Sequence, residues 1–182
     1  MSNFYIADTH FGHANVIRFD NRPFLSVEEM DETLIKNWNN TVSNEDFVYI
    51  LGDFSWYNEI KTLQILDRLK GRKILIKGNH DRISPKIAKQ FLKICDYLDF
   101  CDNNNRVILS HYPLMSWNGQ FRGSIHLYGH VHNTRQWELC EKYKKESEKS
   151  YSIPAKMYNV GCMMPYMKYT PRKICEIAEN EI

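Results

Sequence analysis

Five short apolar segments of this sequence run directly into side chains that can bind a metal ion. Each segment is predicted to be a strand, and a carboxylate, an imidazole or a carboxamide follows it at once. Five of the seven histidines of the chain fall in these segments, which a random scatter would rarely produce. The five motifs are Asp8-x-His10, Gly52-Asp53, Gly78-Asn79-His80-Asp81, Ser110-His111 and Gly129-His130-x-His132.

These residue types suit a site for two divalent metal ions. Carboxylate, imidazole and amide groups form a mixed nitrogen and oxygen shell for a transition metal, and the motifs lack the cysteines of a structural zinc site. A carboxylate can bridge two metals, and Asp53 is the best candidate for that role. Side chains of an extended segment repeat every two residues, so each D-x-H or H-x-H motif is expected to present both ligands on one side. Taken alone, Asp8 or Asp53 could be only a helix or turn cap, and His111 only a structural histidine.

The first half of the chain predicts strands that alternate with helices. Ser26 and Glu29 form a capping box ahead of an amphipathic segment. Gly71 ends the next helical segment, and proline suits the first turn of a third. The predicted strands are 4–7, 47–51 and 74–76, and the predicted helices are 27–38, 60–69 and one that begins near Ser84-Pro85.

The second half predicts strands that pair with one another. The turn-rich residues 102–105 connect two strands in a hairpin. The mixed-charge run 141–150 is interpreted as a solvated loop or hairpin tip. The predicted strands are 97–101, 106–110, 125–128 and 157–160, and a last helix is predicted from Thr170-Pro171 to about Glu179.

This order of elements predicts an α/β fold, with mixed sheets inside and helices outside. Ligands of such folds gather beyond the carboxyl ends of the strands, where all five motifs lie. The length of 182 residues predicts one domain over 1–182, with a charged loop or hairpin insertion at about 133–155.

Composition excludes several classes of function. The formal charge of +2 is too close to zero to predict a membrane or a stable nucleic-acid partner. The five cysteines form no CxxC pair, so we expect free thiols in a reducing compartment. The sequence shows no signal peptide and no apolar run of about 20 residues, so a cytoplasmic location is expected. Nothing in the pattern specifies an oligomeric state.

The order and chemistry of the five motifs resemble the calcineurin-like metallophosphoesterase superfamily. The resemblance covers nearly the whole chain apart from about residues 133–155. The segments ADTHFGHANVIRFDNRPF, LGDFSW, HYPLMSWN, LYGHVH and YNVG resemble a small bacterial and phage subgroup. That subgroup continues from NVG to an acidic residue two positions later, whereas this chain has Cys162-Met163-Met164.

The resemblance implies a four-layer α/β/β/α sandwich around two metal positions. Manganese, iron and zinc all suit such a ligand set. One position would be held by Asp8, His10, Asp53 and His132, and the other by Asp53, Asn79, His111 and His130.

The resemblance also implies hydrolysis of a phosphate ester by a hydroxide that two metals activate, roughly 3.5–4 Å apart. His80 would face the substrate as a general acid or transition-state stabiliser. Asp81 could orient a loop or His80, or could cap the next helix. In the phosphoprotein phosphatases a carboxylate soon after the GD motif partners this histidine, and here the stretch reads Phe54-Ser55-Trp56.

Substrate contacts are predicted for His13, Arg18 and Arg22, since guanidinium groups match phosphate oxygens in bidentate geometry. The alternatives are a helix start for His13 and surface salt bridges for the arginines. Trp56, Trp117 and Phe121 could stack on a base or pack in the core, Arg122 is a weaker phosphate candidate, and His126 is expected to be structural.

A phosphodiester or nucleotide-like small molecule is the predicted substrate. The alternatives are a phosphomonoesterase or protein phosphatase, and a non-catalytic metal-binding scaffold of the same fold. The last usually lacks metal ligands or the GNH histidine, and all of these are present here.

Overall fold

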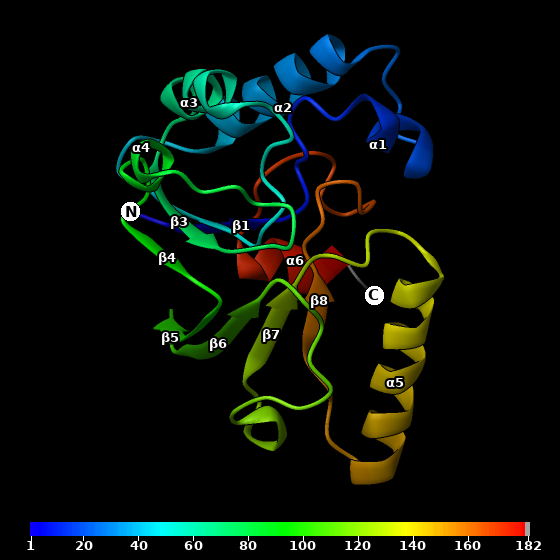
Figure 1. Ribbon diagram of the computed structural model, residues 1–182. Coiled ribbons are helices and arrows are strands. Elements are labelled where there is room, and N and C mark those ends of the chain that lie inside the picture. Colours follow the sequence, from blue (N-terminus) through cyan, green and yellow to red (C-terminus); the bar gives the residue numbers. More distant parts are fainter. Residues whose placement is uncertain (181–182) are drawn as a thin grey trace.

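The computed structural model describes residues 1–180 and contains two four-stranded sheets (Figure 1). All strand pairs of the first sheet are parallel. Ile6, Ile50 and Leu75 lie level in this sheet, so the residues that follow them meet at one edge. The strands of the first sheet, in spatial order, are β1 (Asn3–Ile6), β2 (Phe47–Ile50), β3 (Arg72–Ile76) and β4 (Lys93–Cys95).

The second sheet is mixed. Its first two strands form the predicted antiparallel hairpin, and Asn103 and Asn104 take positive φ in the tight turn, which asparagine tolerates well. The other strand pairs are parallel. The strands, in spatial order, are β5 (Tyr97–Asp102), β6 (Asn105–Ser110), β7 (Ile125–Tyr128) and β8 (Met157–Asn159).

Helices α2 (Val27–Thr41) and α3 (Glu59–Arg68) cover the outer face of the first sheet (Figure 1). Their apolar stripes join the main core through residues such as Leu34 and Leu66, which are 1% exposed. The Ser26 hydroxyl accepts a hydrogen bond from the Glu29 N–H at the start of α2, as the capping box predicts. Shorter helices are α1 (Ala14–Phe19), α4 (Pro85–Ala88), the 3-10 helix η1 (Gln120–Arg122) and α6 (Ile174–Asn180).

The charged run 141–150 is helical, and its interpretation as a loop or hairpin is wrong. It belongs to α5 (Arg135–Tyr151), which is capped by Thr134, whose hydroxyl accepts a hydrogen bond from the Gln136 N–H. Trp137, Cys140 and Tyr143 recur at helical spacing and pack against a second apolar cluster on the outer face of the second sheet. The charges occupy the remaining faces, so the run is the solvated side of a helix.

These four layers confirm the α/β/β/α fold. The second sheet shows the alternation that such a sandwich requires, since Val107 and Leu109 face the main core while Ile108 faces α5. The part of the chain that the structure describes contains no helix that is long and apolar enough to cross a membrane.

The C-terminal helix begins three residues later than Pro171. Arg172 forms an antiparallel bridge with Tyr5, and this pairing keeps the chain extended. The helix starts at Ile174, where Glu176 accepts a hydrogen bond from the Lys173 N–H.

Candidate metal centre

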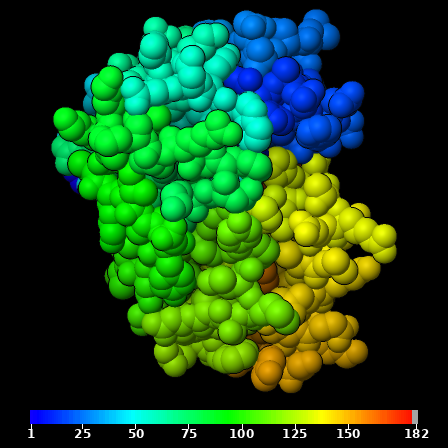
Figure 2. Space-filling view, viewed as in Figure 1, coloured from blue at the N-terminus to red at the C-terminus, as the bar shows by residue number. Residues whose placement is uncertain are grey.

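The carboxyl ends of both sheets meet at one place. Ala7, directly after β1, bridges Gly161, which follows β8. The Ala7 N–H donates to the Val160 carbonyl at 2.8 Å, and the Cys162 N–H donates to the Ala7 carbonyl at 2.8 Å. This junction brings motifs from the two halves of the chain into one cluster, on the face where Figure 2 shows the blue, cyan, green and yellow segments side by side.

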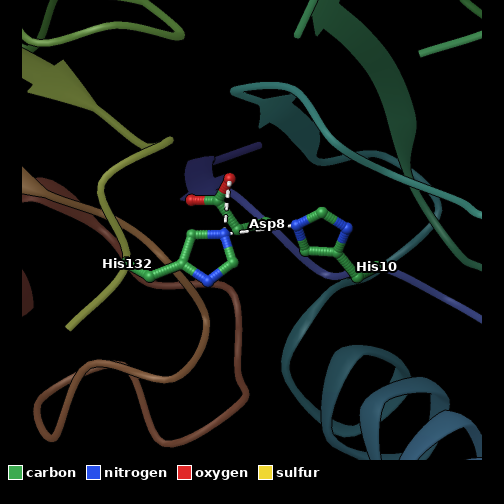
Figure 3. Close-up of side chains that lie close together, drawn as sticks. All are labelled: Asp8, His10 and His132. Carbon is green, nitrogen blue, oxygen red and sulfur yellow. Dashed lines mark hydrogen bonds and ion pairs between the residues drawn. The ribbon is translucent and has the colours of Figure 1, made fainter. Parts of the chain in front are cut away.

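A first cluster consists of Asp8, His10 and His132, whose ligand atoms all lie within 4.8 Å of one another (Figure 3). The two imidazole Nε2 atoms are 3.2 Å apart, and Nε2 of His132 is 3.8 Å from Asp8 Oδ1. The side chains come from the end of β1 and from the loop after β7, 122 residues apart in the chain.

A second cluster consists of Asp53, His111 and His130, with the same mutual spacing of ligand atoms. Asn79 adjoins it, because its Oδ1 atom is 2.9 Å from Nε2 of His111. The site thus contains all seven predicted metal ligands.

Asp53 lies between the two clusters. Its Oδ2 atom is 3.7 Å from Nε2 of His10 and 3.6 Å from Nε2 of His111. Its Oδ1 atom accepts a hydrogen bond from the His80 N–H at 2.9 Å, so that oxygen is held by the chain while Oδ2 faces both clusters. This is the geometry that a bridging carboxylate requires.

The backbone at the ligands is not extended, which corrects the strand argument for the D-x-H and H-x-H motifs. Both members of each motif have φ between +48° and +69°, and Asp53 has φ of 53°. Left-handed conformations cost non-glycine residues energy and collect at functional sites. The side chains converge through these sharp turns after the strands, not through the two-residue repeat of a strand. The residues in question are Asp8, His10, His130 and His132.

The chain at position 129 passes so close to Ala7 and Asp8 that only glycine fits there. A Cβ atom there would lie 2.6 Å from Asp8 Oδ2 and 2.6 Å from the Cβ atom of Ala7. The neighbouring His130 N–H donates to both oxygens of Asp8, at 3.2 and 3.0 Å. The glycine of the GHxH motif therefore lets β7 approach the first cluster.

These observations agree with the comparisons with known proteins. The family model of calcineurin-like phosphoesterases matches residues 4–155. The chain belongs to the calcineurin-like phosphoesterase family.

An uncharacterized protein of Methanocaldococcus jannaschii is 42% identical over 131 residues, which cover 71% of this chain and 68% of that protein. The Gene 66 protein of Mycobacterium phage D29 is 31% identical over 162 residues, covering 73% of this chain and 80% of that protein. A crystal structure of a protein of unknown function from Aquifex aeolicus has a TM-score of 0.72 and 28% identity, and the match covers 97% of each chain. The similarity confirms the fold and the family, and the protein is a metallophosphoesterase.

The residues of this phosphoesterase fit two divalent cations. Burial lowers the pKa of His10 to about 2, helped by the positive charges of His132 and Arg22. A neutral imidazole is the form that binds metal. Burial also raises the pKa of Asp8 to about 6, and a cation beside this buried carboxylate would favour its charged form. Which metal occupies the site stays a prediction.

A buried ion pair supports the first cluster from beneath. Asp20 Oδ1 lies 2.7 Å from Nδ1 of His132, which leaves Nε2 to face the cluster. Burial alone would lower the pKa of His132, but the hydrogen bond that its ring donates to Asp20 and the charge of Asp8 outweigh burial and raise that pKa. Asp20 in turn forms an ion pair with Arg22, whose Nη2 atom is 2.8 Å from Oδ2 of Asp20. Carboxylate–imidazole pairs of this kind fix the orientation and tautomer of metal ligands.

Sequence reasoning missed Asp20 and misplaced Arg22. The guanidinium of Arg22 is buried and donates to Asp20 and to the carbonyls of Thr9 and Asp8, so it faces inward and away from solvent. Neither a phosphate contact nor a surface salt bridge describes it. Asp20, two residues before Arg22, can be seen in the sequence as a possible partner of that arginine. Its pairing with His132 cannot, because the two residues are 112 positions apart.

The second cluster rests on backbone groups. Nδ1 of His111 lies 2.8 Å from the Leu51 carbonyl. Asp81 accepts hydrogen bonds from the N–H groups of Asp53, Phe54 and Gly78 at 3.0, 2.9 and 2.8 Å. Asp81 therefore ties the GD and GNHD loops together, while the cap of α4 is Ser84.

His80 lies beside the ligands and is exposed. Its ring is 6.1 Å from that of His10 and 4.8 Å from that of Trp56, which is 46% exposed. His13 packs edge-on against Trp56 with ring centroids 4.3 Å apart. Arg18 is exposed and lies over the Phe19 ring, and the contacts of His13 and Arg18 with substrate stay predictions.

The other residues that the sequence singled out have structural contacts. His126 is buried in β7 between the Ile108 carbonyl and the Leu114 N–H, as a structural histidine. Trp117 is buried and donates to the Ser124 carbonyl, and exposed Phe121 packs against Tyr151. The departure from the subgroup at positions 162–164 is buried beneath the first cluster, where the Cys162 thiol donates to the Asp8 carbonyl.

Proposed function

We propose that this phosphoesterase hydrolyses a phosphodiester of a nucleotide-like small molecule. The observation that carries the proposal is the position of Asp53 Oδ2 between the two ligand clusters, with the exposed side chain of His80 beside them. Two divalent cations bound there would lower the pKa of a water molecule and neutralise charge on the phosphoryl oxygens.

The reaction adds water across one P–O bond. The water oxygen bonds to phosphorus, the bond from phosphorus to the leaving oxygen breaks, and that oxygen takes up a proton. His80 would supply this proton, and two observations support that role: its side chain is exposed, and its main-chain N–H is held by the carboxylate of Asp53. Asn79, next to it, holds its amide oxygen toward the second cluster.

A protein-phosphatase activity is disfavoured by the surroundings of His80. No carboxylate among residues 1–180 forms a hydrogen bond or ion pair with its ring, and Asp81 next to it is engaged with three backbone N–H groups. The partner carboxylate that such phosphatases use is therefore lacking in the described part of the chain.

Metal analysis and kinetics test the proposal. We expect purified protein reconstituted with Mn²⁺ to bind two ions per chain and to hydrolyse bis(p-nitrophenyl) phosphate faster than p-nitrophenyl phosphate. Chelation with EDTA should abolish the activity, and added Mn²⁺ should restore it. His80→Ala should keep both metals while kcat falls by about 100-fold, the usual contribution of a general acid.

Two outcomes would reject the proposal. Binding of two metals without hydrolysis of either ester would favour the non-catalytic scaffold. A preference for the monoester would favour the phosphomonoesterase alternative.

A further inference from the structure

A groove leads from the metal centre past His80. The part next to the ligands has a volume of about 120 Å³ and is lined by Asn79, His80, Trp56 and Arg82, among others. A larger part of about 620 Å³ is lined by Trp56 and Arg82 together with Ser84 and its neighbours. The two parts share Trp56, Tyr57 and Arg82 in their linings, so they adjoin at these residues between the β2 and β3 loops. In Figure 2 the cyan and green segments that carry these loops adjoin on the visible face.

Trp56 offers this groove a fixed aromatic surface. Its ring is held by His13 at 4.3 Å and by His80 at 4.8 Å between centroids, yet the residue remains 46% exposed. An exposed indole that packs against two imidazoles is suited to stack on a planar ring such as a nucleobase.

Arg82 offers the groove an uncompensated positive charge. It is exposed and forms no hydrogen bond or ion pair with any residue that the structure describes. Two exposed arginines elsewhere are neutralised, because Arg72 pairs with Glu45 at 2.9 Å and Arg106 pairs with Asp99 at 2.8 Å. The acidic residue that lines the groove, Glu59, lies 3.4 Å from Lys86 and does not neutralise Arg82.

We infer that this groove binds the leaving group of the substrate, and that this group is a nucleotide with a further phosphate. Its base would stack on Trp56, and the further phosphate would bind the Arg82 guanidinium, which favours phosphate in bidentate geometry. The inference rests on the proposed function. In that proposal His80 gives its proton to the leaving oxygen. His80 lines the groove next to the ligands, so the leaving alcohol lies on the groove side of the P–O bond that breaks.

The test compares substrates that differ only in the further phosphate. The probes are the thymidine dinucleotide TpT and its two forms with a terminal phosphate, pTpT and TpTp, with bis(p-nitrophenyl) phosphate as a reference. We expect one phosphorylated dinucleotide to have a kcat/KM about tenfold above that of TpT, the ratio for a charge-assisted hydrogen bond. Arg82→Gln should remove this preference mainly through KM and leave hydrolysis of the reference ester unchanged.

Matched variants distinguish a specific role of the groove residues in substrate preference from general effects of substitution. Arg72→Gln removes an exposed arginine at the amino end of β3 and should keep the preference. Trp56→Leu should lower kcat/KM for all three dinucleotides by about tenfold, as loss of base stacking does, and Trp56→Phe should recover most of it.

The results distinguish the two proposals. If the wild type hydrolyses the reference ester but cleaves the three dinucleotides equally well, the groove inference is overturned and the proposed function stands. Equal losses on all substrates in Arg82→Gln would also overturn it. If the wild type with Mn²⁺ does not hydrolyse even the reference ester, the proposed function itself fails.

Discussion

The two ligand clusters are supported in different ways. In the first cluster, His132 is oriented by the side chain of Asp20, which is itself held by Arg22. In the second cluster, His111 is oriented by a main-chain carbonyl, and the Asp81 carboxylate ties the loops that carry Asp53 and Asn79 together by accepting from their backbone N–H groups. The support of the first cluster depends on one charged pair, whereas the support of the second depends on the pairing of the strands and on the hydrogen bonds from backbone N–H groups to Asp81.

The comparison teaches where the site is vulnerable. A single substitution can remove the carboxylate that orients His132 while all metal ligands remain. Among the residues that the structure describes, no carboxylate orients the His111 imidazole through its Nδ1 atom, which lies 2.8 Å from the carbonyl of Leu51. We therefore expect the two metals to respond differently to substitutions around them.

The largest expected effect is that of Asp53→Asn, which weakens both clusters at once. The bound metal should fall from two ions to one or fewer, and kcat should fall by about 1,000-fold, since two-metal sites supply several kcal/mol of transition-state stabilisation. Metal content by elemental analysis and single-turnover kinetics check this. Asp8→Asn, which alters only the first cluster, should keep one metal. Full activity of Asp53→Asn would show that Asp53 is not the bridge.

Asp20→Asn should affect the first cluster and leave the second unchanged. Loss of such an orienting carboxylate costs about 10- to 100-fold in metal affinity, and we expect this loss at one of the two metals only. Titration with Mn²⁺ followed by calorimetry should then resolve one weakened and one unchanged binding step. Asp96→Asn, at an exposed residue that pairs with Lys77 at 3.8 Å, is the matched control. Equal weakening of both steps would contradict the proposed difference in support.

Acid should loosen the second sheet through His126, which connects β7 with the loop after β6. Burial lowers its pKa to about 4, so the unfolded chain binds a proton that the folded chain excludes between pH 6.5 and 4. The stabilisation is present above pH 6.5 and is lost as the pH falls, by about 2 kcal/mol at pH 5. Urea unfolding at pH 7 and pH 5 should show this loss, and His126→Gln should reduce the pH dependence by the same amount. An unchanged pH dependence in the variant would contradict it.

The smallest expected effect is that of Asp81→Asn. The amide oxygen can still accept from two of the three backbone N–H groups, so stability should fall by about 1 kcal/mol, the value of one hydrogen bond. Urea unfolding of the metal-free protein measures this loss, with Asp67→Asn on α3 as the control. A loss several times larger would show that the second cluster, like the first, depends on a single side chain.

The sequence predicted most elements because their signals are local. Apolar runs followed by turns located the strands, and the capping box located α2. It failed at α5, where charged residues outnumber the apolar positions at Trp137, Cys140 and Tyr143. The amphipathic pattern of this helix is visible only when the run is read together with the residues that precede it.

By itself, the sequence determined the family and the reaction class and predicted the seven metal ligands that the structure brings together, because the motifs carry the chemistry in their residue types and order. Only the tertiary structure decided how those ligands are held and what lies beside them. The pairing of Asp20 with His132 depends on segments that meet when the two sheets pack together, and the groove at Trp56 and Arg82 depends on the loops that the pairing of β2 with β3 brings side by side. Such contacts leave no local pattern, because each partner is an ordinary polar or aromatic residue until the other is brought against it.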